Sequence, residues 1–115
     1  MAEPPVARVA ATSAPLGDDP LAPAQVIAGE PRTSSYVLTE SPGGVESGVW
    51  RCTPGTFSDV EADEVFVVIE GRATIGWDGG EIEVGPGDVC TLAPGTETVW
   101  TVHETLLKGF RISPG

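Results

Sequence analysis

The sequence is poor in the residue types that bind transition metals. Its 115 residues include one histidine, His103, and two cysteines, Cys52 and Cys90, which form no CxxC or mixed Cys/His run. A zinc knuckle or a framework of disulfides needs clustered or more numerous cysteines, so this composition argues against both. We expect two reduced thiols packed inside the protein.

Basic residues are also scarce. Only 6 Lys and Arg stand against 17 Asp and Glu, which gives a formal net charge of −11. Such a charge repels the phosphates of nucleic acids and the surfaces of anionic membranes, so we expect neither a nucleic-acid partner nor a membrane partner. The sequence has no apolar run long enough for a membrane helix, and Met1 is not followed by the pattern of a signal peptide. We therefore expect a soluble, cytoplasmic protein.

Aromatic residues are absent from the first 35 residues of the chain. The first of them is Tyr36, whereas six of the eleven prolines lie within residues 1–31. A segment rich in Ala and Pro without aromatic anchors buries too little surface to offset its ordering entropy. We predict a flexible N-terminal arm over residues 1–25 and a barrel domain over residues 26–115. In the alternative, the arm docks as an extended strand on the barrel or on a second subunit.

Beyond the arm, turn sequences rich in Gly and Pro alternate with short β-prone runs, and no segment has a helical period. One such turn, Asp78-Gly79-Gly80, is typical of a tight hairpin. The pattern predicts an all-β protein, an antiparallel jelly-roll barrel. The predicted strands are 35–40, 47–53, 64–69, 72–77, 81–84, 89–92, 97–103 and 106–112.

The run from Val65 to Ile69 is apolar at every position, which is typical of a strand buried on both faces. Glu64 stands immediately before it. A carboxylate at the start of a buried strand is costly unless a partner neutralises it. Glu64 is therefore predicted to lie at the rim of the barrel or in a functional site.

The arrangement of these motifs resembles the cupin superfamily. Its two cupin-like motifs are Glu64 with the strand that ends at Gly71, and Gly85-Pro86-Gly87-Asp88 with Ala93-Pro94-Gly95. The chain is more closely similar to single-domain cupins grouped with ureidoglycine aminohydrolase and the ethanolamine-utilisation cupin. The residues that carry this second resemblance are 48–55 and Gly95, Trp100, Val102, Glu104 and Lys108. The likeness extends over about residues 29–112 and implies a cupin barrel.

In metal-binding cupins, these motifs supply three histidines and one glutamate. Glu64 stands at the glutamate position, but the histidine positions fall within residues 57–60 and at about Thr98, where this chain has no histidine. One carboxylate and a threonine do not hold a transition metal, so we predict no metal site and no cofactor. A substitute site built from Glu64, both cysteines and His103 is the less favoured alternative.

The alternation of side chains along a strand predicts which residues share a face. If Glu64 points into the barrel, Phe66 and Val68 point inward as well. If Thr98 points inward, so does Trp100, and His103 on the same strand points outward.

The resemblance implies that Trp50, Cys52, Lys108 and Phe110 line or floor a pocket. Glu64 and Lys108 are the candidate catalytic residues, and the candidate ligand-binding residues are Trp50, Cys52, Phe57, Phe66, Thr98 and Trp100. In the alternative, the two charged residues form an ion pair without a ligand, and the tryptophans belong to the core.

The sequence is compatible with two functions. The preferred hypothesis is a metal-independent cupin that binds a small-molecule ligand through Glu64 and Lys108 among aromatic walls. The alternative is an enzyme acting on a small metabolite and similar to ureidoglycine aminohydrolase, with Glu64 as acid or base. A homodimer is also predicted, because small cupins commonly cover their sheet edges by pairing, and Trp77 is a candidate interface residue.

The acidic run of Asp59, Glu61, Asp63 and Glu64 is a candidate site for a divalent cation or a solvent-exposed edge. It lacks the spacing of a calcium loop, so we predict a solvated edge rather than a site for calcium or magnesium.

Overall fold

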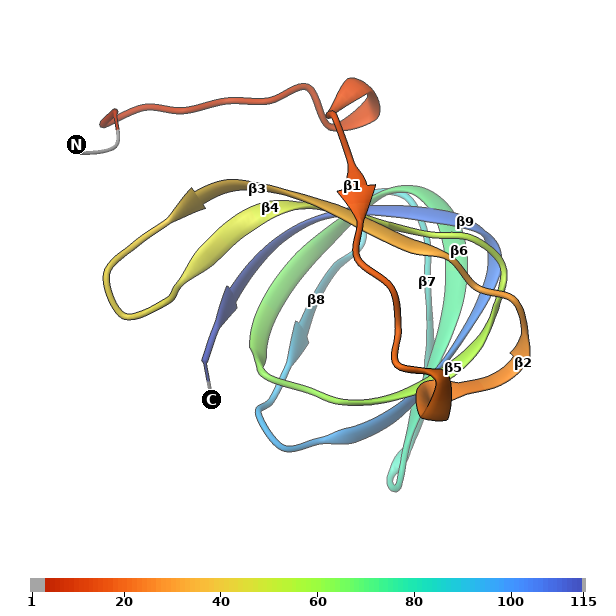
Figure 1. The fold of residues 1–115 in the computed structure, drawn as a ribbon. Coiled ribbons are helices and arrows are strands. Elements are labelled where there is room, and N and C mark those ends of the chain that lie inside the picture. Colours follow the sequence, from red (N-terminus) through yellow and green to blue (C-terminus); the bar gives the residue numbers. More distant parts are fainter. Residues whose placement is uncertain (1–3, 115) are drawn as a thin grey trace.

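The computed structural model describes residues 4–114, and most of them lie in the strands of one curled antiparallel sheet (Figure 1). Residues 1–3 of the predicted arm and residue 115 of the predicted barrel domain lie outside the described residues. The elements are η1 (Ala11–Ser13), β1 (Gly17–Asp18), η2 (Pro23–Gln25), β2 (Val26–Gly29), β3 (Thr33–Glu40), β4 (Glu46–Cys52), β5 (Gly55–Val60), β6 (Asp63–Trp77), β7 (Gly80–Val84), β8 (Val89–Leu92) and β9 (Glu97–Ser113). The predicted all-β antiparallel barrel is confirmed.

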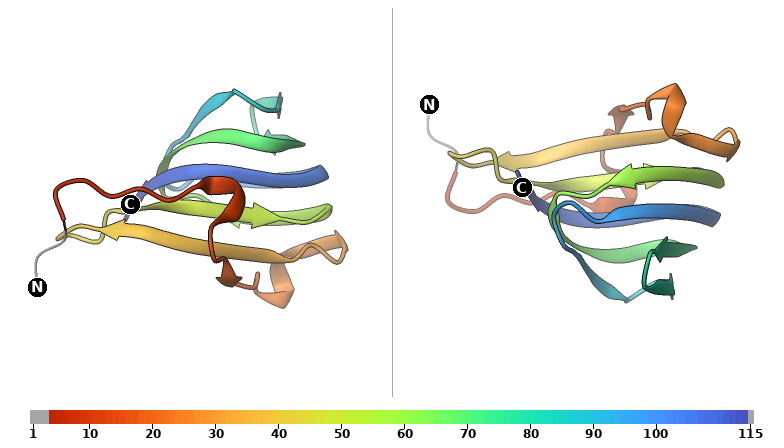
Figure 2. Two further views of the ribbon diagram at one scale, coloured as in Figure 1. Left: turned by 90° about the horizontal axis from the view of Figure 1, so that it is seen from above. Right: turned by 90° about the horizontal axis from the view of Figure 1, so that it is seen from below.

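Two long strands, β6 and β9, form the centre of the barrel. They pair with each other along most of their length. On its other edge, β9 pairs first with β5 and then with β4, and the sheet continues from β4 through β3 to β1. The remaining strands β7 and β8 both pair with β6. The curled sheet is seen along its opening in Figure 1 and from two further sides in Figure 2.

The predicted break at Gly71 is wrong, because β6 is one strand and not two. Its pairing with β9 shifts register on both sides of this residue. Gly71 has φ +89°, and a Cβ atom there would lie 2.1 Å from the carbonyl oxygen of Thr105. A glycine is therefore required to bend the strand without ending it. The run after His103 likewise continues β9.

Strand β5 was not among the predicted strands. Its sequence, GTFSDV, contains Gly, Ser and Asp, which are typical of turns and depleted in strands. Pairing with β9 on one edge and with β2 on the other nevertheless makes it a strand. Tertiary pairing thus overrides local propensity at this position.

The prediction that the run from Val65 to Ile69 is buried on both faces is wrong. Its residues alternate: Phe66 and Val68 are each 1% exposed, whereas Val65 and Val67 are 39% and 38% exposed. One face of the strand points into the barrel and the other points outward. Apolar side chains on an outer surface are common, so the sequence run alone did not distinguish the two cases.

Part of the predicted arm lies against the barrel. Strand β1 pairs with β3, and Leu21 packs against the hydrophobic core. The side chain of Gln25 donates a hydrogen bond to the carbonyl oxygen of Ser58 at 3.0 Å. These contacts bring residues 17–25 to one edge of the barrel (Figure 1).

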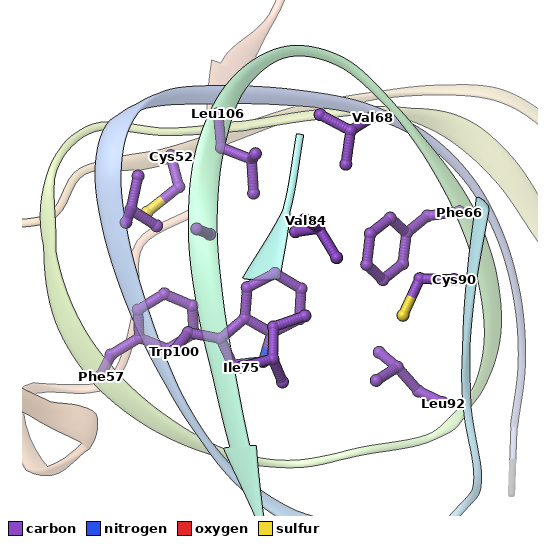
Figure 3. Packing of buried hydrophobic residues seen from close by; sticks show 12 residues of the cluster. Cys52, Phe57, Phe66, Val68, Ile75, Val84, Cys90, Leu92, Trp100 and Leu106 are labelled. Atoms are coloured by element: carbon purple, nitrogen blue, oxygen red, sulfur yellow. The ribbon is translucent and has the colours of Figure 1, made fainter. Parts of the chain in front are cut away.

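The hydrophobic core fills the interior of the barrel with side chains from β4 to β9 (Figure 3). Its largest fully buried side chains include Phe66, Ile75 and Leu106. Cys52 and Cys90 are free thiols and lie on opposite sides of this interior (Figure 3). Among residues 4–114, no helix is long and apolar enough to cross a membrane.

Candidate functional site

A cavity of about 520 Å³ opens beside the core. Of the predicted site residues, Trp50, Phe57, Glu64, Trp100 and Lys108 line it, and they come from four different strands. Leu21 and residues 17–19 border the same cavity, so the N-terminal segment contributes part of its wall. Its volume lies within the usual range for a small-molecule site.

Glu64 and Lys108 form a buried ion pair in this cavity. Glu64 lies near the start of β6 and Lys108 on β9, and the Lys108 Nζ donates a hydrogen bond to Glu64 Oε2 at 2.7 Å. The two side chains are 6% and 7% exposed. Removal of either charge would leave the other one buried without its partner, which is strongly destabilising.

Aromatic rings surround the ammonium group of Lys108. Its Nζ lies 4.4 Å from the ring centroid of Phe66, 4.6 Å from that of Trp50 and 4.9 Å from that of Trp100. A cation within about 6 Å of a ring centroid is attracted by the negative face of the ring. The ammonium is therefore stabilised by Glu64 and by three aromatic rings together.

Glu61 belongs to the site, although the acidic run was predicted to be a solvated edge. That prediction is wrong for Glu61 and Glu64, each 7% exposed, whereas Asp63 is exposed. Thr98 Oγ1 and Trp100 Nε1 donate hydrogen bonds to Glu61 Oε2 at 2.7 and 2.9 Å. Side-chain alternation puts residues 57, 59 and 61 on one face, so it could have placed Glu61 on the inward face of Phe57. That alternation can be read only if β5 is recognised as a strand.

Asp59 also faces the cavity from β5. Burial is the main reason that its pKa rises from 3.8 to about 6, and the nearby charge of Glu61 raises it further. The backbone N–H of Val60 and the ammonium of Lys108 act in the opposite direction. Asp59 is thus a carboxyl group at the cavity that changes charge close to neutral pH.

Three predicted ligand-binding residues do not line the cavity themselves. Phe66 lies behind Lys108, and Thr98 holds Glu61 in place. Cys52 is fully buried in the core, where its Sγ lies 3.2 Å from the carbonyl oxygen of Thr53. Burial raises the pKa of the Cys52 thiol to about 12, so this sulfur is kept protonated.

The tryptophans of the site belong both to the core and to the cavity wall. Trp100 is 2% exposed, lies nearly parallel to Phe57 at 5.9 Å between centroids, and meets Trp50 edge to face at 6.0 Å. Such aromatic pairs add stability beyond that of area burial. Trp100 is therefore fixed by packing, while the partly exposed Trp50 is accessible from the cavity.

The side chains of this site do not fit a transition metal. Within the described part of the chain, no group of three or more His, Cys, Asp or Glu residues is placed to hold a metal ion. His103 is exposed on β9, as predicted, and its Nε2 lies 2.8 Å from Thr74 Oγ1. Glu64, the residue at the cupin glutamate position, is already bound by the ammonium of Lys108.

A second, more open hollow of about 1210 Å³ lies beside the β6–β7 hairpin. Thr98 is the only predicted site residue on its wall, where the exposed Trp77 is also found. The buried charges and the paired aromatic rings lie at the smaller cavity, which is therefore the candidate site.

The chain matches a known protein family. Residues 39–110 match the family model described as the EutQ-like cupin domain, which spans more than half of the chain and includes most of the cavity wall. The protein is a EutQ-like cupin. No curated protein sequence matches the chain significantly.

Solved structures of other cupins and of uncharacterised proteins share the fold. A protein of unknown function from Pseudomonas syringae pv. tomato is 27% identical, with a TM-score of 0.80 over 88% of this cupin and 45% of that protein. The EutQ protein of Clostridium difficile is 20% identical, with a TM-score of 0.65 over 73% of this chain and 69% of that one. A Rhizobium leguminosarum protein of unknown function is 22% identical, with a TM-score of 0.65 over 72% and 82% of the two chains.

Proposed function

We propose that this cupin binds a small-molecule ligand in the cavity of about 520 Å³ and that it does so without a metal ion. The observation that carries the proposal is the pairing of the buried charges of Glu61, Glu64 and Lys108 with aromatic walls in one cavity. Aromatic walls combined with polar groups that converge on one cavity are typical of a small-molecule site.

The geometry favours binding over acid–base catalysis by Glu64. One oxygen of Glu64 is already bound by the ammonium of Lys108 at 2.7 Å, so the carboxylate is held in position by an internal partner. A general acid or base needs a free path for its proton to the reacting group. The pair is better suited to orienting a ligand and to shaping the charge of the cavity.

A thermal-shift screen of small metabolites tests the proposal. The protein is first dialysed against EDTA, and hits are confirmed by calorimetric titration. Because a ligand that binds only the folded state stabilises it by mass action, we expect a saturable rise in melting temperature for at least one compound class. The absence of any saturable ligand would argue that the buried charges have a purely structural role.

Two tryptophan variants provide a matched comparison. Trp50→Ala removes a cavity wall, whereas Trp77→Ala makes the same change at the separate hollow. We expect Trp50→Ala to abolish the shift and Trp77→Ala to retain it. Metal analysis of the purified protein completes the test, since stoichiometric zinc or manganese would contradict metal-independent binding.

A further inference from the structure

The cavity has a large surplus of negative charge. Lys108 is the one basic side chain on its wall within the part of the chain that the structure describes. The acidic side chains on the same wall are Asp18, Asp19, Glu46, Asp59, Glu61 and Glu64. Lys108 is paired with Glu64, and none of the other carboxylates on this wall forms an ion pair with a basic group of residues 4–114.

Glu61 is the buried member of this surplus. Its two hydrogen-bond donors, the hydroxyl of Thr98 and the indole N–H of Trp100, are both neutral. A buried carboxylate that has only neutral donors is still costly, and the approach of a cation relieves that cost. Glu61 is therefore a group that a positively charged ligand would stabilise.

One oxygen of Glu61 is available to such a ligand. Both hydrogen bonds of the side chain end on Oε2. No side-chain oxygen or nitrogen of residues 4–114 is fully buried without a partner, so Oε1 is not fully buried, and Glu61 itself lines the cavity. The carboxylate is thus anchored by one oxygen and presents the other.

The aromatic walls suit an organic cation. The positions of Trp50 and Trp100 around the ammonium of Lys108 show that these rings already stabilise one positive charge. A cation held near aromatic faces gains most when it is weakly hydrated, as amidinium and guanidinium groups are. The carboxylates do not converge in the way that a metal ion requires, because no group of three or more candidate ligands is placed together among the described residues.

We infer that the ligand of this cavity is a small organic cation that carries an amidinium or guanidinium group. Its charged group binds Glu61 Oε1, and its body lies against Trp50. This inference rests on the proposed function, because it requires that the cavity be a binding site.

A series of three planar probes of nearly equal shape tests the charge of the ligand: benzamidine, benzamide and benzoate. Each is titrated into the EDTA-dialysed protein at about pH 7.5 and about 20 mM salt, where charge interactions are weakly screened. We expect saturable binding of benzamidine and at least about tenfold weaker binding of benzamide and benzoate. Higher salt should weaken the binding of benzamidine.

Variants then place the cation at Glu61. Glu61→Gln should weaken benzamidine at least about tenfold, since it removes the charge and retains the shape. Asp59 is half-buried, so Asp59→Asn should disturb the fold less, and it should weaken the binding of benzamidine by a smaller factor. Glu70→Gln, at an exposed position of β6 that does not line the cavity, should leave the binding of benzamidine unchanged.

Other outcomes would overturn the inference. Equal binding of benzamide or benzoate, lost in Trp50→Ala, would show a real ligand site that does not select a cation, so the proposed function would stand. If no probe bound and the metabolites that bind were neutral or anionic, the cavity would likewise be a ligand site that does not select a cation. Competition by calcium or magnesium at stoichiometric levels would assign the carboxylates to a metal instead.

Discussion

The ion pair of Glu64 and Lys108 should dominate the stability of the site. We consider Lys108→Met, Glu64→Gln and the double variant. Methionine retains an apolar side chain of similar length, so the change removes the charge with little loss of packing. Glutamine has the shape of glutamate and keeps one oxygen as an acceptor.

The size of the effect follows from the burial of the pair. Lys108→Met leaves the 7% exposed Glu64 without its hydrogen bond of 2.7 Å and removes a cation that faces three aromatic rings. Breaking a buried pair from one side costs about 3–5 kcal/mol. We expect about 4 kcal/mol for Lys108→Met, a large fraction of the total stability of a small domain. Because the amide oxygen of glutamine still accepts a hydrogen bond, Glu64→Gln should cost about 2–3 kcal/mol.

The double variant removes both charges, so its loss should be smaller than the sum of the two single losses. We expect a coupling energy of about 3 kcal/mol from urea unfolding of the four proteins. The control is the exposed pair of Arg72 and Glu104, whose N–O distance is 2.6 Å but whose side chains are 53% and 61% exposed. The same cycle there, with Arg72→Met and Glu104→Gln, should give a coupling below about 1 kcal/mol.

The reasoning would be refuted by equal coupling energies at the two pairs. In that event, burial would not be what makes the Glu64–Lys108 interaction strong. A well-folded Lys108→Met protein with an unchanged free energy of unfolding would also refute the reasoning.

Two further predictions concern the bend in β6 and the charge of the cavity. Gly71→Ala should lower the free energy of unfolding in urea by about 3 kcal/mol, because its Cβ would lie 2.1 Å from the carbonyl oxygen of Thr105. Gly87 has a similar φ of +91° but open space around it, so Gly87→Ala should lower that free energy by only about 1 kcal/mol. Equal losses in the two variants would contradict the steric argument. Since the pKa of Asp59 rises from 3.8 to about 6 on folding, the folded state holds the extra proton, so this residue's contribution to stability is complete below about pH 4 and is lost as the pH rises through 6. Asp59→Asn should flatten that part of the stability profile measured by urea unfolding, and an unchanged profile would show that another group titrates there.

The face that each residue presents was largely readable from the sequence. Alternation placed Phe66 on the same face as Glu64, and Trp100 on the same face as Thr98, and all four are buried. Alternation is a local property of an extended chain, so it needs no knowledge of the partner strands. The same reasoning failed at Glu61, because it depends on recognising β5, whose own composition is that of a turn.

The antiparallel β-barrel, and the placement of Glu64 on one strand face with Phe66 and Val68, follow from the sequence alone, since turn residues and side-chain alternation act over a few neighbours. The direction of Glu64 into the barrel and the groups that surround its carboxylate depend on the tertiary structure. Lys108 lies 44 residues from Glu64 in the sequence, and Thr98 lies 37 residues from Glu61. The pairing of β9 with β6 brings Lys108 to Glu64, and its pairing with β5 brings Thr98 to Glu61. A surplus of buried negative charge is a property of that assembled cavity, so no local pattern in the sequence records it.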